Sequence, residues 1–150
     1  MPEDREYVLP GGLAVYRTQP SIGAVVSGID LAQGLSKSQS EGLRRALFAH
    51  GVVFLRGQTH VGFAEHLALA ETFGTPVRDG HDADRPEVTP VRAKAGSAEG
   101  VASAWHSDDC YAASPPAISI LRALSRQSQG HFPIWLWRFS RHLCTLYVRP

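Results

Sequence analysis

The sequence predicts an α+β domain, because strand-type and helix-type segments follow one another along its 150 residues. A β-branched segment over residues 21–31 precedes a helix, and a short apolar segment over residues 52–56 precedes a second helix. Further strand-type segments follow at residues 87–93 and 117–123. A chain of this length can bury a real hydrophobic core.

The first helix has the clearest boundaries. Ser36 and Gln39 have the spacing of a capping box, and Gly51 stands where glycine commonly ends a helix. Apolar residues and one histidine recur between them at helical spacing, which predicts a buried stripe of Leu43, Ala46, Leu47 and His50. Arg44 and Arg45 are expected to face outward.

The remaining elements have weaker signals. Residues 52–56 form a short apolar run, expected to be a strand buried on both faces. The second helix, over about residues 60–73, carries a stripe of Phe63, Leu67 and Ala70. Pro90 predicts that residues 87–93 form an edge strand. Proline has no backbone N–H to donate to a neighbouring strand, so it is poorly tolerated in a central strand, which pairs on both sides.

Composition excludes several classes of function. The formal charge of +1 provides no basic field for nucleic acid, and no apolar run approaches the length of a membrane span. The charged N-terminus does not resemble a signal peptide, and Cys110 and Cys144 are expected to be reduced thiols. The cytoplasm is therefore the expected location.

One stretch contains residues suited to metal chemistry. In the sequence Trp105-His106-Ser107-Asp108, an extended strand would point His106 and Asp108 to the same face. One histidine and one carboxylate are two members of the 2-His-1-carboxylate triad that binds non-haem Fe(II). A second histidine would have to come from elsewhere in the fold, and a solvated loop pair is the simpler interpretation of the pattern alone.

Two other polar groupings are open to interpretation. Cys110 alternates with His106 and Asp108 along the same predicted strand, so the three could bind zinc, although a core thiol is the simpler role for Cys110. His81, Asp82 and Asp84 are closely spaced and are expected to lie in a solvated loop.

Four stretches together resemble the taurine dioxygenase/2,4-D dioxygenase (TauD/TfdA) family of Fe(II)- and 2-oxoglutarate-dependent oxygenases. Their order and spacing agree with the family over about residues 13–124. They are residues 22–31 (IGAVVSGIDL), residues 35–58 with HGVVFLRGQ at their end, Phe73-Gly74, and residues 105–108 (WHSD) with the following PPA at 115–117.

The resemblance implies a double-stranded β-helix, a relative of the jelly roll, with helices packed outside it. It implies Fe(II) as cofactor and 2-oxoglutarate as co-substrate, with O2 and a small organic acid, sulfonate or similar compound as the substrates. His106 and Asp108 match the family's iron ligands, and Trp105 would pack beside the site. No nucleic-acid or membrane partner is implied, and a homo-oligomer is compatible with the resemblance.

Some positions depart from the family pattern. Val25 stands where glutamate is common, and Ala102 stands where taurine-specific members carry asparagine. A substrate-side histidine after Phe73-Gly74 has no clear counterpart, since Asp79 falls near its place and His81 lies beyond. These departures argue against taurine, so the substrate stays open.

The last part of the chain does not resemble the family. No Asp or Glu follows Asp109, and residues 125–150 are rich in Trp and Arg. The family's second iron-binding histidine and the arginine that pairs with the oxo-acid lie much farther along the chain, and His131 and His142 are not expected to replace that histidine. We therefore expect residues 1–124 to be the N-terminal part of a dioxygenase domain and residues 125–150 to be a non-family tail.

The codons of the tail, read one base later, can encode family-like residues, which suggests a frameshift or an aberrant exon end near residues 124–130. With two ligands of three, the 150-residue chain is expected to be inactive. The alternative is a non-catalytic remnant or binding module of the same fold.

Overall fold

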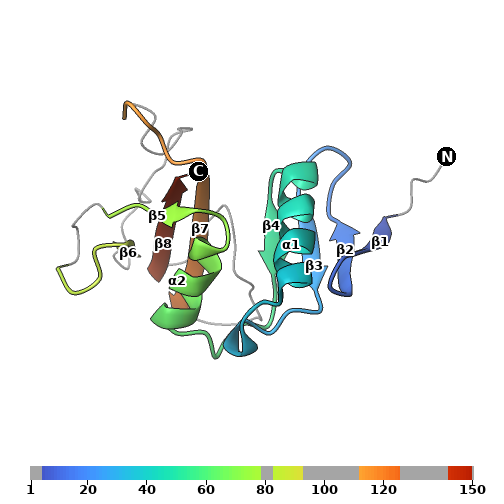
Figure 1. Cartoon of the computed structure of the whole chain (residues 1–150), viewed down its shortest axis with the longest axis horizontal. Helices are drawn as coiled ribbons and strands as arrows, with labels where there is room; N and C mark the ends of the chain where they lie inside the picture. Colours follow the sequence, from blue (N-terminus) through green and yellow to red (C-terminus); the bar gives the residue numbers. More distant parts are fainter. Residues whose placement is uncertain (1–4, 79–82, 93–111, 126–141, 150) are drawn as a thin grey trace, which may run out of the picture. The chain divides into compact units, whose positions relative to one another are not determined.

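The computed structural model describes residues 5–78, 83–92, 112–125 and 142–149. The chain divides into two compact units (Figure 1). The first comprises Met1–Leu69 with Phe132–Leu136, and the second comprises Ala70–His131 with Trp137–Pro150. Each unit has a sheet of its own.

The sheet of the first unit begins with a hairpin. Strands β1 (Glu6–Leu9) and β2 (Leu13–Arg17) are antiparallel and pair Leu9 with Leu13 at the turn. Gly11 and Gly12 in this turn have φ values of 81° and 73°, a left-handed conformation that glycine adopts without a steric penalty. The sequence analysis did not predict these two strands.

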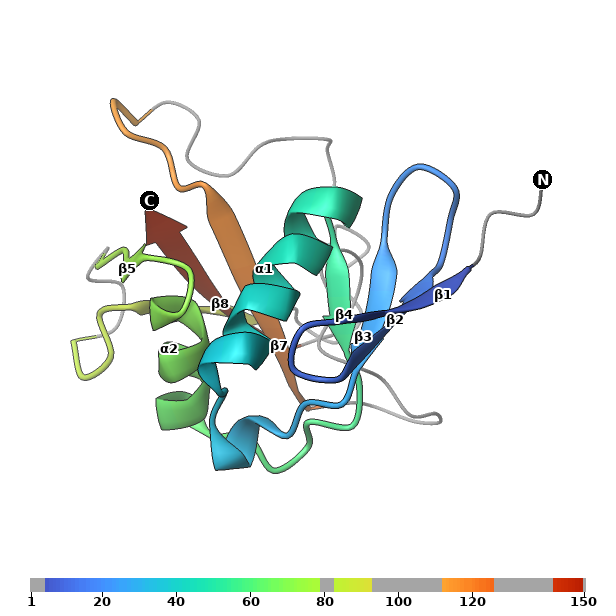
Figure 2. The same ribbon diagram turned by 45° about the vertical axis from the view of Figure 1, so that its right-hand side comes forward.

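A helical crossover completes this sheet in the order β1-β2-β3-β4. Strand β3 (Ala24–Ser27) is antiparallel to β2 and leads through the 3-10 helix η1 (Leu31–Gln33) into α1 (Lys37–His50). Strand β4 (Val53–Leu55) then returns parallel to β3. Helix α1 contacts all four strands and covers one face of the sheet (Figure 2).

The predicted capping box of α1 is present. The Oγ of Ser36 accepts from the backbone N–H of Gln39 at 3.2 Å, and the Oε1 of Gln39 accepts from the backbone N–H of Ser36 at 3.0 Å. Gly51 ends the helix with φ 67°, and its N–H donates to the carbonyl of Leu47. Arg45 points outward as expected, whereas Arg44 is half-buried.

The core of the first unit lies between α1 and the sheet. Alternate strand residues face the helix, because a strand places successive side chains on opposite faces. Each leucine or valine buried here contributes about 1.5–3 kcal/mol relative to its exposed state. The buried residues are Leu13, Val15, Ala24, Val26 and Leu55 from the strands and Leu43 and Ala46 from α1.

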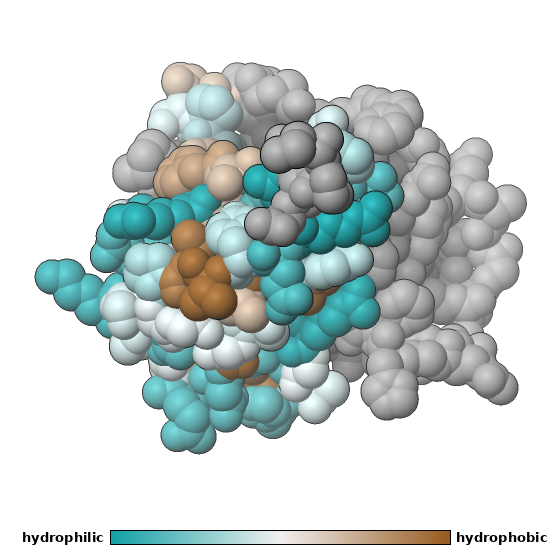
Figure 3. All heavy atoms as spheres, turned by 90° about the vertical axis from the view of Figure 1, so that its right-hand side faces the viewer, coloured by the Kyte–Doolittle hydropathy of each residue, from teal (hydrophilic) through white to brown (hydrophobic). Residues whose placement is uncertain are grey.

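Apolar side chains also remain on the surface. Figure 3 looks at the side of the molecule that carries β1 and shows hydrophobic patches separated by hydrophilic side chains. Among the described residues, the large apolar side chains most exposed to solvent are Val8, Tyr16, Ile22 and Phe48. Strand β4 is only half-buried at Val53 and Phe54, so the prediction of a strand buried on both faces was wrong.

Helix α2 (Phe63–Glu71) is shorter than predicted. Of the predicted stripe, Ala70 is buried, whereas Phe63 and Leu67 are half-buried. Leu69 and His66, which is 1% exposed, are buried beside Ala70, and the histidine was missed because it does not contribute to a hydrophobic pattern.

The second unit is built around β8 (His142–Arg149). Strands β5 (Thr75–Pro76) and β6 (Val88–Arg92) pair with different stretches of β8, and β7 (Ile118–Ser125) pairs along its other edge, all antiparallel. Val88 and Ile120 are both buried, and both pair with Leu146 in the backbone register, from opposite edges of β8.

Two of the predicted strands are confirmed in this sheet, at β6 and β7. Pro90 lies in β6, which forms an outer strand of the described sheet, as the proline predicted. Within the described part of the chain, no helix is long and apolar enough to cross a membrane.

Candidate functional site

The residues predicted to form the iron site lie outside the described residues. This applies to both proposed ligands, to the adjacent tryptophan and cysteine, and to the three positions considered for substrate contact: His106, Asp108, Trp105, Cys110, Ala102, Asp79 and His81. Their roles therefore stay predictions.

The described strands show which elements these segments connect. Residues 93–111 lie between β6 and β7, the two strands that flank β8 on opposite edges. Arg78 and Glu87, which precede and follow residues 79–82 in the sequence, form an ion pair, with 3.2 Å between the Nε of Arg78 and the Oε1 of Glu87. The His-x-Asp motif thus falls in the segment of the sequence between β6 and β7.

The side chains of the described residues do not form a metal site of their own. In residues 5–78, 83–92, 112–125 and 142–149, no three His, Cys, Asp or Glu side chains come together. These parts of the chain therefore supply no complete ligand set for Fe(II), and the prediction continues to depend on His106 and Asp108.

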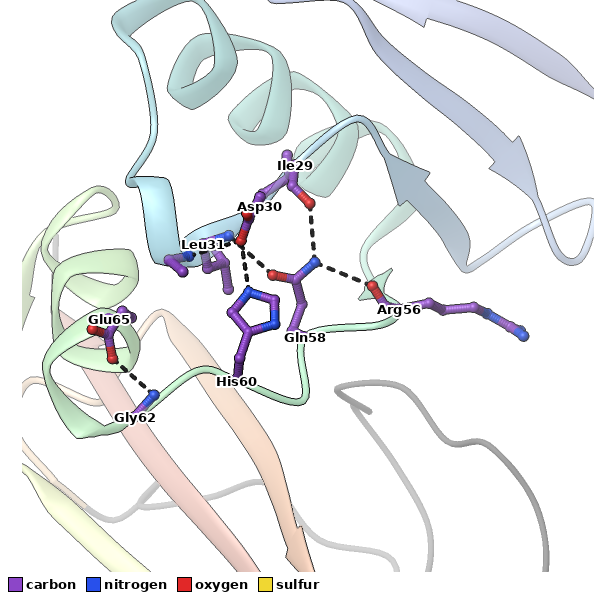
Figure 4. A network of polar contacts seen from close by, with 9 residues as sticks. Ile29, Asp30, Leu31, Arg56, Gln58, His60, Gly62 and Glu65 are labelled. Carbon is purple, nitrogen blue, oxygen red and sulfur yellow. Dashed lines mark hydrogen bonds and ion pairs between the residues drawn. The ribbon is translucent and has the colours of Figure 1, made fainter.

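A polar cluster of several hydrogen-bonded residues lies where β3 and β4 end (Figure 4). Asp30 caps η1 by accepting from the N–H of Ala32 at 3.0 Å, and the same Oδ1 lies 2.7 Å from the Nε2 of His60. The hydrogen bond with His60, followed by that from Ala32, lowers the pKa of Asp30. Both side chains of the Asp30–His60 pair are about half exposed, so water screens their attraction.

Gln58 connects the same two loops through its amide group. Its Oε1 accepts from the N–H of Leu31 at 3.0 Å, and its Nε2 donates to the carbonyls of Ile29 at 3.0 Å and Arg56 at 3.1 Å (Figure 4). Both amide protons are therefore used within the chain. In this arrangement the amide of Gln58 holds the ends of two parallel strands together, and it does not act as a ligand-binding group.

A second polar cluster lies between the sheet and the end of α1. The hydroxyl of Tyr7 and the Nε2 of His50 are 2.6 Å apart, and the guanidinium carbon of Arg17 lies 6.0 Å from the centre of the Tyr7 ring. His50 is 8% exposed, and burial, followed by the charge of Arg17, lowers its pKa.

The sequence indicated some members of these clusters but not the contacts between them. His50 was correctly predicted to face the core, because it continues the apolar stripe of α1. Its partner Tyr7 lies 43 residues away, and the Gln58 clamp joins residues about 30 positions apart. Helical periodicity describes local geometry only, so it could not reveal either pair.

Two known proteins are similar to this chain in sequence. It is 36% identical over 115 residues to an alkylsulfatase of Acinetobacter baylyi, an alignment that covers 76% of this chain and 36% of that protein. It is 32% identical over 129 residues to an alpha-ketoglutarate-dependent sulfate ester dioxygenase of Pseudomonas putida, covering 82% and 41%.

The fold has relatives among solved structures as well. The crystal structure of a taurine dioxygenase from Burkholderia xenovorans superimposes with a TM-score of 0.67 at 33% identity, over 79% of this chain and 42% of that one. The chain therefore spans about two fifths of the length of the proteins it matches.

The family-level comparison covers most of the sequence. The model of the taurine catabolism dioxygenase TauD, TfdA family matches residues 14–131, which include β2 to β4, both helices and the His-x-Asp motif. Together with the two relatives that are more than 30% identical, this match confirms the expected family. The chain belongs to the taurine catabolism dioxygenase TauD, TfdA family.

Proposed function

We propose that this chain is part of an Fe(II)- and 2-oxoglutarate-dependent dioxygenase that oxidises a small organic acid, sulfonate or sulfate ester. The observation that carries the proposal is the 36% identity to an alkylsulfatase, supported by the 32% identity to a sulfate ester dioxygenase. Ala102, which stands where taurine-specific members carry asparagine, favours a sulfate ester or another substrate over taurine.

In this proposal, His106 and Asp108 hold the iron and the rest of the fold is a double-stranded β-helix. Bound Fe(II) with 2-oxoglutarate would supply the oxidising chemistry, which couples decarboxylation of the oxo-acid to oxidation of the substrate. Trp105, next to the first ligand, would exclude water from the site. The TM-score of 0.67 to a taurine dioxygenase supports this architecture.

Metal binding by the 150-residue chain tests the ligand assignment. A calorimetric titration with Fe(II) under argon should show weak binding, because two protein ligands hold a metal less tightly than three. His106→Ala and Asp108→Ala should each abolish it, whereas His131→Ala and His142→Ala serve as matched controls and should leave it unchanged. Binding that survives His106→Ala, or that requires His131 or His142, would contradict the assignment.

The same titration separates iron from zinc. If Cys110 completes a zinc site with His106 and Asp108, Cys110→Ser should release bound zinc. The proposed iron site predicts instead that Cys110→Ser leaves Fe(II) binding unchanged.

We further propose that residues 1–124 are the N-terminal part of the dioxygenase domain and that residues 125–150 are a tail read out of frame. Resequencing the gene from the codon of Ala117 to several hundred bases beyond that of Pro150 tests this proposal. A single-base correction that restores a downstream His and Arg would support it, and an unchanged reading frame in all reads would exclude it.

Turnover distinguishes an enzyme from a remnant. The protein translated from the corrected frame should form succinate from 2-oxoglutarate faster with an alkyl sulfate than with taurine, whereas the 150-residue chain should form little or none. If neither protein forms succinate at saturating Fe(II), the non-catalytic binding module is the better interpretation.

A further inference from the structure

We propose that Tyr7 and His50 form a proton-sensitive latch that holds the edge strand β1 against the C-terminal end of α1. The inference concerns the first unit only and is independent of the proposed enzymatic function. It depends on the position of β1 in the sheet, on the contact between the two side chains and on the charges around them.

Strand β1 is the element of this unit that is easiest to detach. It has four residues and, within the described part of the chain, pairs with β2 alone. Val8 is 71% exposed and Tyr7 and Leu9 are half-buried, so no side chain of the strand is fully buried. Short edge strands of this kind open more readily than central strands, since they have fewer buried contacts to break.

Tyr7 is the residue that connects β1 to α1. It pairs with Val15, which is fully buried, so its side chain points to the face that α1 covers. There its hydroxyl meets the Nε2 of His50 at 2.6 Å, and the two rings lie 5.9 Å apart at 41°. With a neutral imidazole that carries its proton on Nδ1, the hydroxyl donates and Nε2 accepts.

The backbone around His50 holds the imidazole in place. The carbonyl of His50 accepts from the N–H of Gly23 at 2.9 Å, and Gly51 ends the helix directly after it. The histidine therefore belongs to the rigid part of the unit, whereas Tyr7 belongs to the strand that can leave.

Charges near the latch disfavour a protonated His50. Arg17, on the same face of β2, is the positive group next to Tyr7 and His50. Strands β3 and β4 contain no charged residue, and Glu6 of β1 pairs with Tyr16 on the opposite face of the sheet. On α1 itself, the nearest ion pair, Glu41–Arg45, is exposed.

Protonation and opening are consequently linked. Burial and Arg17 lower the pKa of His50 while the latch is closed, and opening exposes the imidazole, whose pKa then returns toward 6.5. The open form therefore binds a proton more readily than the closed form. Below about pH 6.5 the opening constant should rise by at most about tenfold per pH unit, until the pKa of the closed form is reached.

Hydrogen exchange of the 150-residue chain tests the latch. Between pH 8 and pH 5, after correction for intrinsic rates, amides of β1 should lose protection as the pH falls, while those of β3 should keep theirs. His50→Gln should remove the pH dependence, because a glutamine amide does not titrate. His60→Gln is the matched control and should behave as the wild type, since His60 is half exposed and pairs with Asp30 elsewhere.

A spectroscopic titration makes the test independent of how well His50→Gln folds. In the wild-type chain, the imidazole proton of His50 followed by NMR should titrate below pH 6.5. Protection of β1 that does not vary with pH, the same variation in His50→Gln, or a His50 pKa at or above 6.5 would each overturn the proposal.

Discussion

Gly42 gives the sharpest test of the packing between α1 and the β1–β2 hairpin. A glycine inside a helix is usually destabilising, and replacing it with alanine at an exposed position gains about 1 kcal/mol. At Gly42 a Cβ atom would lie 2.3 Å from the carbonyl oxygen of Pro10 and 3.1 Å from the Cδ1 of Leu13, and real Cβ contacts essentially never fall under 3.0 Å. The hairpin turn approaches the helix closely at this residue, and only glycine leaves room for it.

Gly42→Ala should therefore destabilise the protein despite its better helix propensity. The close contact is with backbone rather than with the end of a flexible side chain, so the hairpin must move as a whole. Overpacking of this kind costs about 1–3 kcal/mol, and a backbone contact belongs at the upper end of that range. Subtracting about 1 kcal/mol of helix propensity leaves a net loss of about 2 kcal/mol.

Urea denaturation followed by circular dichroism measures this loss. A change of about 2 kcal/mol should lower the midpoint by about 1 M, given the m-values typical of small proteins. Arg45→Ala and Arg45→Gly are the matched controls, because Arg45 is exposed on the same helix and both variants lose its contact with Glu41. At position 45 the alanine variant should be more stable than the glycine variant. If Gly42→Ala were as stable as the wild type, the close approach of Pro10 to α1 would be refuted.

Two further predictions concern polar contacts of the same unit. Ser36→Ala should lower the free energy of unfolding by about 1 kcal/mol, since it removes the oxygen that caps Gln39, and a Thr replacement that retains this oxygen should recover most of the loss in urea denaturation. The lowered pKa of Asp30 means that its stabilising contribution is present above the unfolded pKa of about 3.9 and is lost as the pH falls through the lower folded value. Asp30→Asn should remove this part of the acid dependence of thermal stability, and a variant that kept the full dependence would show that other carboxyl groups cause it.

Elements with strong local signals could be predicted from the sequence. The capping box at Ser36 and the glycine at position 51 define α1 through contacts within a few residues, and the structure has both. The strands β3, β4, β6 and β7 were likewise predicted from short β-branched or apolar segments. The β1–β2 hairpin was missed because its strands have only four and five residues, and such short apolar runs do not by themselves distinguish a strand from other structure.

The central strand of the second sheet shows a different limit. β8 lies in the segment expected to be a non-family tail, and its residues pair with residues 17 to 74 positions earlier in the chain. A strand of this kind is selected by its pairing partners, which local patterns do not describe. The assignment of that segment to the tail stays a prediction.

For this protein, the sequence by itself indicated the family and the approximate positions of the two helices, and it is the basis on which His106 and Asp108 are proposed as iron ligands. These depend on residue types at short, defined spacings. Only the tertiary structure decided that Gln58 clamps the ends of two parallel strands, that Gly42 admits the hairpin turn, and that His50 meets Tyr7. Each of these contacts joins residues far apart in the chain, and their energies depend on distance and burial, which arise only when the chain has folded.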